Sequence, residues 1–176
     1  NKKNILDSLS FESISDYKKL YISPGINLKK YFSPSALKKL NYISDLDLFF
    51  QNNKSIKIGV TGTNGKSTLV NYLNQILNTV SSSIALGNIG ETLLDNIKHK
   101  HKYTVIEASS FQLEKMKKNL FDFSIITNIQ NDHIDFHGNY ENYKNAKLKI
   151  CSEKGKTIFC ESDDYQKIAI EFVSGI

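Results

Sequence analysis

The sequence predicts an α/β fold built on a mainly parallel sheet. From residue 56 onward, short apolar runs alternate with stretches of helical periodicity, and this alternation is typical of strand–helix–strand crossovers. A glycine-rich turn joins the first apolar run to the first helical stretch, as in a phosphate-binding loop. Ligands are therefore expected at the carboxyl ends of the strands.

The expected elements follow in chain order. The earlier part predicts a short strand at 18–22, a turn at Ser23-Pro24-Gly25, a helix that starts at Ser33-Pro34 and continues to 40, and a short helix at 45–50. Residues 51–55 are polar enough for a linker, which divides the chain into domains 1–54 and 55–176. The later strands are expected at 56–60, 84–86, 103–108, 123–129 and 157–160. The later helices are expected at 67–78, 91–98, 140–151 and 163–173, and the run 111–118 fits a helical turn or irregular structure.

Charge and composition argue against several classes of function. The 176 residues carry 23 basic and 18 acidic side chains, and every basic residue is lysine. The lysines are scattered as pairs, with neither a basic stripe nor an aromatic stacking platform, so no nucleic-acid partner is expected. No apolar run approaches the roughly 20 residues needed to cross a bilayer, and the N-terminus lacks a signal-peptide pattern. The protein is therefore expected in the cytoplasm, without a membrane partner.

The candidate phosphate loop runs from Gly59 to Thr68. Its glycines let the backbone pass close to an anion, and the amides at the start of the next helix point at that anion. Lys66 would reach the outer phosphates, and the Ser67 hydroxyl would ligate magnesium. The strict pattern has a glycine where Val60 stands, so the loop is a variant. The predicted ATP-binding residues are Gly62, Thr63, Asn64, Gly65, Lys66, Ser67 and Thr68.

Other strand ends also carry polar residues. Glu107 stands at the end of a strand beside the loop, where an acid can hold the magnesium that bridges nucleotide phosphates, although a surface or capping acid fits as well. Asn88 lies in a glycine-flanked turn, where its amide can donate and accept hydrogen bonds, and a plain strand-to-helix turn is the alternative. His133, between Asp132 and Asp135, is favoured as a metal ligand.

Taken together, these stretches resemble the ATP-dependent Mur ligases of peptidoglycan synthesis. The loop Thr61–Thr68 is the hallmark of that superfamily, which includes the folylpolyglutamate synthases. The stretch Glu107-Ala108-Ser109-Ser110-Phe111-Gln112-Leu113-Glu114 resembles the branch that adds D-glutamate. Further stretches match in the same order, and the resemblance covers most of residues 20–160: Ser23-Pro24-Gly25-Ile26, Gly87-Asn88-Ile89-Gly90, Asn131-Asp132-His133-Ile134-Asp135 and Asn145-Ala146-Lys147-Leu148.

The resemblance implies an incomplete central ATPase domain, preceded by the tail of a Rossmann-like N-terminal domain that binds the uridine nucleotide. The C-terminal domain of the family has no counterpart here. The chain is therefore expected to be a fragment, inactive by itself, of a monomeric enzyme.

The implied reaction joins D-glutamate to UDP-N-acetylmuramoyl-L-alanine with ATP. The γ-phosphoryl group passes to the substrate carboxylate and gives an acyl phosphate. The amine of D-glutamate attacks this acyl phosphate, phosphate is released, and a new amide is formed. Both partners in the first step are anionic, so cations must neutralise their charge.

The resemblance also implies roles for single residues. Lys66 would neutralise the transferring phosphate, and Ser67 and Glu107 would hold a first Mg²⁺. His133 and a carbamylated Lys147 would hold a second one. Spacing alone makes Lys147 only a lysine on an amphipathic helix, and carbamylation needs a neutral amine whose pKa is lowered locally.

Asn88 and Ser109 would contact the muramoyl substrate or its acyl phosphate, and the participation of His137 stays open. Two alternatives also remain: another Mur ligase or folylpolyglutamate synthase-like amide ligase, and a non-catalytic nucleotide-binding remnant.

Overall fold

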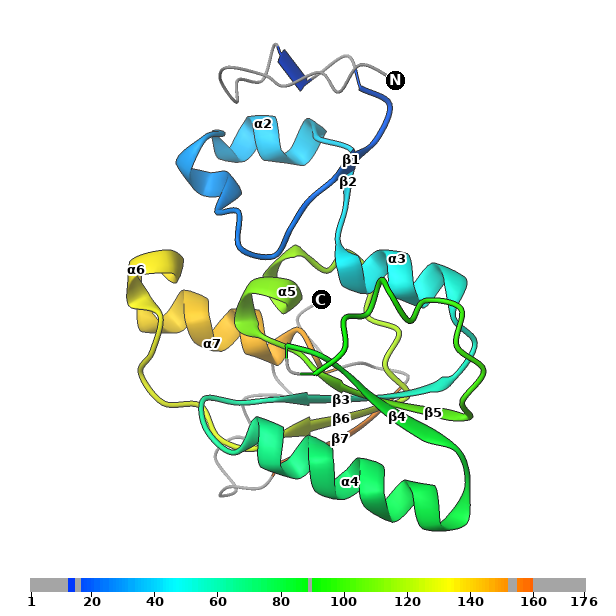
Figure 1. The fold of residues 1–176 in the computed structure, drawn as a ribbon. Helices are drawn as coiled ribbons and strands as arrows, with labels where there is room; N and C mark the ends of the chain where they lie inside the picture. Colours follow the sequence, from blue (N-terminus) through cyan, green and yellow to red (C-terminus); the bar gives the residue numbers. More distant parts are fainter. Residues whose placement is uncertain (1–12, 15–16, 89, 152–154, 160–176) are drawn as a thin grey trace.

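The centre of the computed structural model, which describes residues 13–14, 17–88, 90–151 and 155–159, is a five-stranded sheet (Figure 1). Its strands lie in the order β4-β5-β3-β6-β7, and every neighbouring pair is parallel. The bounds are Ile56–Thr61 for β3, Ser83–Gly87 for β4, Tyr103–Glu107 for β5, Phe123–Ile126 for β6 and Lys156–Phe159 for β7. The predicted α/β class and parallel sheet are thereby confirmed.

Helices cover both faces of this sheet. One face carries α4 (Lys66–Val80), and the other carries α3 (Asp45–Asn52), α5 (Ser110–Lys115) and α7 (Tyr140–Leu148), with the short α6 (Ile134–His137) beside α7 (Figure 1). Because consecutive strand residues point to opposite faces, neighbouring side chains enter different cores. Val105 packs with Val70 of α4, whereas Ile106 joins Phe49 of α3 and Leu113 of α5.

The preceding segment forms a smaller unit. β1 (Leu20–Tyr21) and β2 (Tyr42–Ile43) pair in parallel, and η1 (Leu28–Lys30) and α2 (Pro34–Lys39) lie between them in the chain. Leu28, Phe32 and Leu40 belong to a hydrophobic cluster separate from those of the sheet. The predicted helix start is confirmed, because the Ser33 hydroxyl accepts a hydrogen bond from the amide of Ala36 at 3.3 Å.

Helix α3 packs with the sheet. Its Leu46, Phe49 and Phe50 belong to the cluster that contains Ile106 of β5 and Phe121. The division of the chain after residue 54 stays a prediction, and this packing favours a boundary before Asp45 instead.

The helix predicted at 91–98 is wrong, because the chain forms a series of turns there. Glu91 makes a parallel bridge to Leu86 of β4. The Thr92 hydroxyl then accepts from the amide of Asp95 at 3.2 Å and donates to the carboxylate of the same residue at 2.6 Å. Such local side-chain bonds compete with helical ones, and periodicity does not register them.

Several predicted ends also shift. The ambiguous run 111–118 contains a true helix, α5, and the short α6 was not predicted. The strand expected at 123–129 ends at Ile126, and the helix expected at 140–151 ends at Leu148. The helix predicted at 163–173 lies outside the described residues.

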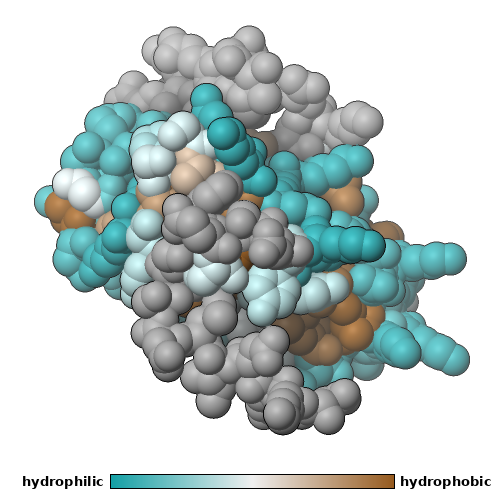
Figure 2. Space-filling model, turned by 90° about the horizontal axis from the view of Figure 1, so that it is seen from above, coloured by the Kyte–Doolittle hydropathy of each residue, from teal (hydrophilic) through white to brown (hydrophobic). Residues whose placement is uncertain are grey.

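The described helices include none that is long and apolar enough to cross a membrane. Among the described residues visible in Figure 2, hydrophilic side chains predominate and hydrophobic ones gather in smaller patches.

Candidate active site

The loop after β3 turns through two glycines with positive φ. Gly62 has a φ of 151° and Gly65, the N-cap of α4, a φ of 82°. A Cβ at Gly62 would collide with the side chain of Thr127, so the close approach of β6 requires glycine there. The backbone amides at the start of α4 are thereby aimed at the mouth of the loop.

Residues after β6 support the loop from the side. The carbonyl of Asn128 accepts from the amide of Thr63 at 2.9 Å, and its side chain accepts from the amide of Asn64 at 3.0 Å. The Thr127 hydroxyl donates to the carbonyl of Asn64 at 2.7 Å. Thr127 still donates its amide to the carbonyl of Thr61 in β3 at 3.0 Å, and from Asn128 onward the chain bonds to the phosphate loop instead of extending β6.

Three predicted site residues meet at one buried carboxylate. The Ser67 hydroxyl donates to Oε2 of Glu107 at 2.8 Å, and the Asn88 amide donates to Oε1 at 3.1 Å. Glu107 is only 1% exposed, and it stands beside Val60 in the register of β3 and β5. The alternative of a surface acid is therefore wrong. The nearby Lys66 amine donates to the carbonyl of Thr63 at 2.9 Å.

Lys147 reaches the loop from α7. Its amine is buried, donates to the carbonyl of Gly62 at 2.7 Å and lies 4.8 Å from the centre of the Tyr143 ring. Burial, and after it the charge of Lys66, lowers the pKa of Lys147 from 10.5 to about 7, although Asp132 and Glu107 act in the opposite direction. A substantial fraction of this amine is therefore neutral near pH 7.

His133 is placed between the loop and α6. It has a φ of 50°, its side chain is about half exposed, and Nε2 lies 3.5 Å from Oδ2 of Asp132. Its ring is 6.2 Å from that of Tyr143, so His133 and Lys147 both border the same tyrosine. The role of His133 as a metal ligand stays a prediction.

Ser109 and Asn88 line one cleft of about 730 Å³. Ser109 also caps α5, where it exchanges hydrogen bonds with Gln112 in a capping box. The opposite wall comes from the N-terminal unit and includes the turn Ser23–Gly25. The cleft therefore lies where the two parts of the chain meet.

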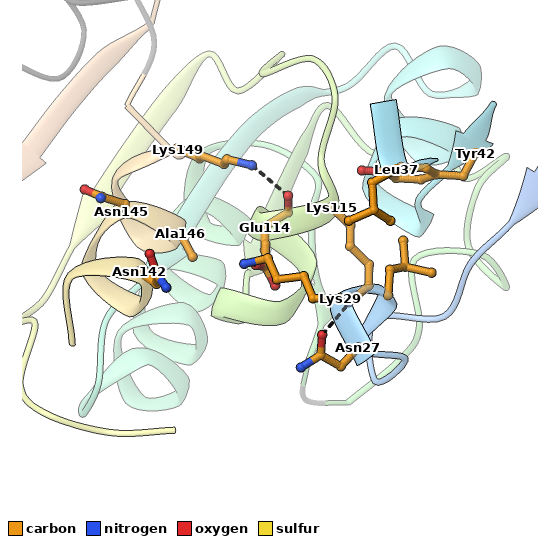
Figure 3. Close-up of a pocket in the computed structure, with 11 residues that line it drawn as sticks. Asn27, Lys29, Leu37, Tyr42, Glu114, Lys115, Asn142, Asn145, Ala146 and Lys149 are labelled. Atoms are coloured by element: carbon orange, nitrogen blue, oxygen red, sulfur yellow. Dashed lines mark hydrogen bonds and ion pairs between the residues drawn. The ribbon is translucent and has the colours of Figure 1, made fainter. Parts of the chain in front are cut away.

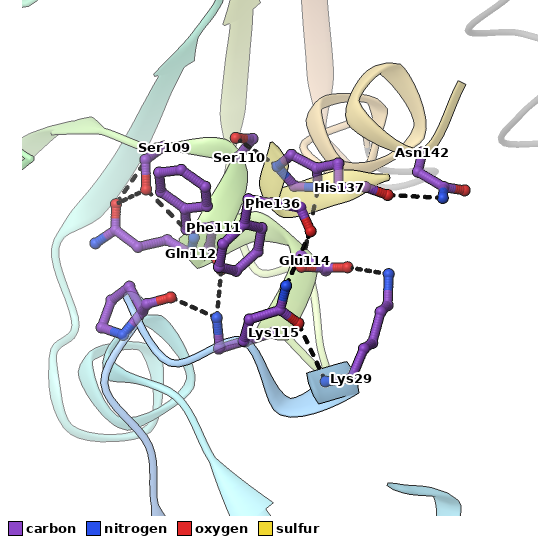
Figure 4. Close-up of polar contacts among 12 residues, drawn as sticks. Lys29, Ser109, Ser110, Phe111, Gln112, Glu114, Lys115, Phe136, His137 and Asn142 are labelled. Carbon is purple, nitrogen blue, oxygen red and sulfur yellow. Dashed lines mark hydrogen bonds and ion pairs between the residues drawn. The ribbon is translucent and has the colours of Figure 1, made fainter. Parts of the chain in front are cut away.

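His137, the last residue of α6, is buried against α5 (Figure 4), and its ring centre lies 5.5 Å from that of Tyr143. Nε2 is 3.0 Å from the hydroxyl of Ser110, and the ring stacks on Phe111 with planes 1° apart. Nδ1 is 4.0 Å from Oε2 of Glu114, and burial lowers the pKa of His137. Its burial and its aromatic contacts favour a structural role for His137, and its participation in the reaction stays open.

A second cavity, of about 360 Å³, separates η1 and α2 from α5 and α7 (Figure 3). The Lys29 amine pairs with Glu114 across it, and Lys149 donates to the carbonyl of Glu114 at 2.7 Å. Nearby, Lys115 donates to the carbonyl of Pro24. These contacts connect the N-terminal unit to the sheet, and the phosphate loop contributes nothing to the cavity wall.

Side chains alone do not form a metal cage in the described part of the chain. No three His, Cys, Asp or Glu side chains there gather closely enough to hold an ion. A metal at Glu107 and Ser67 would need further oxygen ligands from elsewhere, such as a nucleotide.

Comparisons with known proteins agree with this fold. The family model described as "Mur ligase middle domain" matches residues 60–175. Two proteins named UDP-N-acetylmuramoylalanine–D-glutamate ligase, from Francisella philomiragia subsp. philomiragia and from Francisella tularensis subsp. tularensis strain WY96-3418, are each 41% identical over 78% of this chain. Those matches cover 34% of the relatives, so the chain spans about a third of their length.

Two solved structures show the same fold. MurF from Acinetobacter baumannii has a TM-score of 0.57 at 20% identity, with 80% of this chain and 33% of that one covered. MurF ligase from Thermotoga maritima in complex with ADP has a TM-score of 0.57 at 19% identity, with 94% and 48% covered.

Proposed function

This chain belongs to the Mur ligase family through its middle domain, and from that premise we propose that it is part of an ATP-dependent ligase. The complete enzyme would add D-glutamate to UDP-N-acetylmuramoyl-L-alanine in peptidoglycan synthesis (the MurD reaction). The choice of amino acid is supported by the two relatives that carry this name at 41% identity. The observation that carries the ligase function is the buried carboxylate of Glu107, joined to Ser67 and Asn88 beside the loop.

In the proposed reaction, ATP converts a poor electrophile into a good one. The carboxylate of the muramoyl substrate takes the γ-phosphoryl group and becomes an acyl phosphate. The amine of D-glutamate attacks the acyl carbon and loses a proton, so that a C–N bond forms while the C–O bond to the phosphate breaks and inorganic phosphate leaves. Lys66 and the first amides of α4 would bind the phosphates, because the amides are already oriented and need little reorganisation.

The residues around Glu107 fit Mg²⁺. A carboxylate that is 1% exposed and a hydroxyl 2.8 Å from it are oxygen ligands of the kind this ion prefers. Bound there, the ion would neutralise charge on the phosphate oxygens. The Asn88 amide would keep the carboxylate oriented.

The environment of Lys147 supports the proposal that this lysine is carbamylated. The attacking amine must be neutral, and a pKa of about 7 leaves a substantial fraction of it neutral near pH 7. Carbamylation would replace a cation beside Lys66 with an anion, which that neighbour favours. His133 would then share a second Mg²⁺ with the modified lysine.

The cleft lined by Asn88 and Ser109 is proposed to take the muramoyl end of the substrate. Both residues reach it from the carboxyl ends of strands, close to Glu107.

The test is a ligase assay on the complete enzyme. ATP-dependent formation of the D-glutamyl amide is expected from UDP-N-acetylmuramoyl-L-alanine, together with loss of product and of Mg-ATP binding in Lys66→Ala. Preference for another amino acid would assign the chain to a different amide ligase of the family. A wild type that binds Mg-ATP but forms no amide would favour the alternative of a non-catalytic nucleotide-binding remnant. Failure of the wild type to bind Mg-ATP would contradict the proposal.

A further inference from the structure

Tyr143 is a buried residue of α7 that the proposed chemistry leaves unused. It is 1% exposed, and its hydroxyl lies 3.0 Å from Oγ1 of Thr63 in the phosphate loop. Thr63 Oγ1 also accepts from the amide of Gln130 at 2.9 Å and lies 3.2 Å from the carbonyl of the same residue. The Thr63 hydroxyl has one proton, so donation to that carbonyl leaves Tyr143 as the donor to Thr63.

The ring of Tyr143 makes a second contact, with the amine of Lys147. Lys147 follows it by one helical turn, and the lysine amine lies 4.8 Å from the ring centre. That amine donates to the carbonyl of Gly62, the residue before Thr63. One tyrosine thus contacts the loop through its hydroxyl and supports through its ring the lysine that contacts the adjacent loop residue.

These contacts point to a mechanical link. The loop turns through two glycines with positive φ, whereas α7 is anchored in the core by Leu148. We propose that Tyr143 is a positioning residue that ties the phosphate loop to α7, so that Thr63 and the Lys147 amine keep a constant separation. The inference uses the proposed function for its activity readout, and its structural readout is independent of that function.

The structural readout is hydrogen–deuterium exchange in the complete, unliganded enzyme. In Tyr143→Phe the ring stays and the bond to Thr63 is lost, so peptides that span residues 61–68 should exchange several-fold faster. The matched control is Tyr140→Phe on the same helix. Its hydroxyl donates to the carbonyl of Ile129 at 3.2 Å, and its ring has Lys144 at 5.9 Å, so it loses a similar bond outside the loop.

The activity readout separates binding from turnover. Tyr143→Phe should raise the KM for ATP about fivefold, the effect of one hydrogen bond, and change kcat less than twofold. Tyr143→Leu also removes the ring and should lower kcat at least tenfold, because Lys147 loses its support. Thermal unfolding of each variant identifies any general loss of fold.

Faster loop exchange in Tyr143→Phe but not in Tyr140→Phe supports the link, whether or not the enzyme makes the expected amide. Equal exchange in the wild type and Tyr143→Phe overturns it, even if the ligase function is established. A wild type that binds no Mg-ATP would refute the proposed function and leave the exchange result standing.

Discussion

Two buried lysines have different surroundings: Lys115 lies at the contact between the N-terminal unit and α5, and Lys147 lies at the candidate active site. Lys115 is 4% exposed, and its pKa is lowered by burial while Glu114 and Asp45 oppose that shift. Its amine donates to the carbonyl of Pro24 and so fastens the N-terminal unit to α5 (Figure 4). At Lys147, the charge of Lys66 acts in the same direction as burial. The largest charge effect therefore opposes burial at Lys115, whereas at Lys147 it reinforces burial and favours a neutral amine.

The largest difference between variants of Lys147 and Lys115 is expected in enzymatic activity. In the complete enzyme, Lys147→Ala should lower turnover by about 100-fold or more, since a charged group beside the transferring phosphate is lost. A short free carboxylate such as formate should restore part of it by replacing the carbamate. Lys115→Ala should reduce stability without any such rescue. Full turnover in Lys147→Ala, or equal rescue of both variants, would mean that Lys147 is no more part of the active site than Lys115 is.

A second test asks whether Glu107 is part of the reactive region. Glu107→Gln keeps the shape and removes the charge, so the Mg²⁺ concentration needed for nucleotide binding should rise about 10- to 100-fold. Titration of Mg²⁺ at fixed ATP measures this shift. Glu141→Gln is the control, because that exposed acid pairs with Lys144 on the outer side of α7. A similar shift in the control would exclude a specific role.

A third test uses pH to examine Lys147 itself. The unfolded lysine holds its proton up to about pH 10.5 and the folded one only up to about pH 7, so unfolding takes up a proton in this window and stability rises with pH across it. The test uses protein kept free of carbon dioxide, in which Lys147 is unmodified, and Lys147→Met removes the titrating amine. Its stability relative to the wild type should be greater at pH 6 than at pH 9, by on the order of 2 kcal/mol.

Chemical denaturation at the two pH values measures that difference. Lys144→Met, on the same helix, controls for the removal of a lysine that pairs with Glu141 at the surface. A stability difference for Lys147→Met that is identical at pH 6 and pH 9 would contradict the lowered pKa.

The smallest effect is expected at the contact between the N-terminal unit and α5. Lys29 is 54% exposed in its pair with Glu114, so solvent screens the attraction, and Lys29→Met should cost less than about 1 kcal/mol. The loss should shrink further at high salt. A larger or salt-independent loss in thermal unfolding would mean that this pair, rather than Lys115, holds the N-terminal unit.

Local pattern was sufficient for most of the framework. The five predicted strands and the helix after the loop are present, because short apolar runs mark strands that are buried on both faces and helical periodicity marks the buried face of a helix. The turns at 91–98 were not predicted, because they depend on a hydrogen bond between Thr92 and Asp95 that hydrophobic spacing does not reveal.

Local hydrophobic patterns do not predict contacts between residues that are far apart in the sequence. Tyr143 and Thr63 are 80 residues apart in the chain, and no spacing rule connects them. The support of the loop by Thr127 and Asn128 was hidden in a run that was predicted to be strand. A signal was present at Lys147 only through family resemblance, since its helical position resembles that of any surface lysine.

By itself, the sequence determined the parallel sheet, the glycine turn into α4 and the polar residues at the strand ends, because each depends on neighbouring residues or on a short motif. Only the tertiary structure decided that Ser67 and Asn88 converge on Glu107, that His137 is buried against α5, and that Lys147 lies beside Lys66. Burial and charge proximity arise from segments that meet in space, and those quantities control the pKa of a lysine.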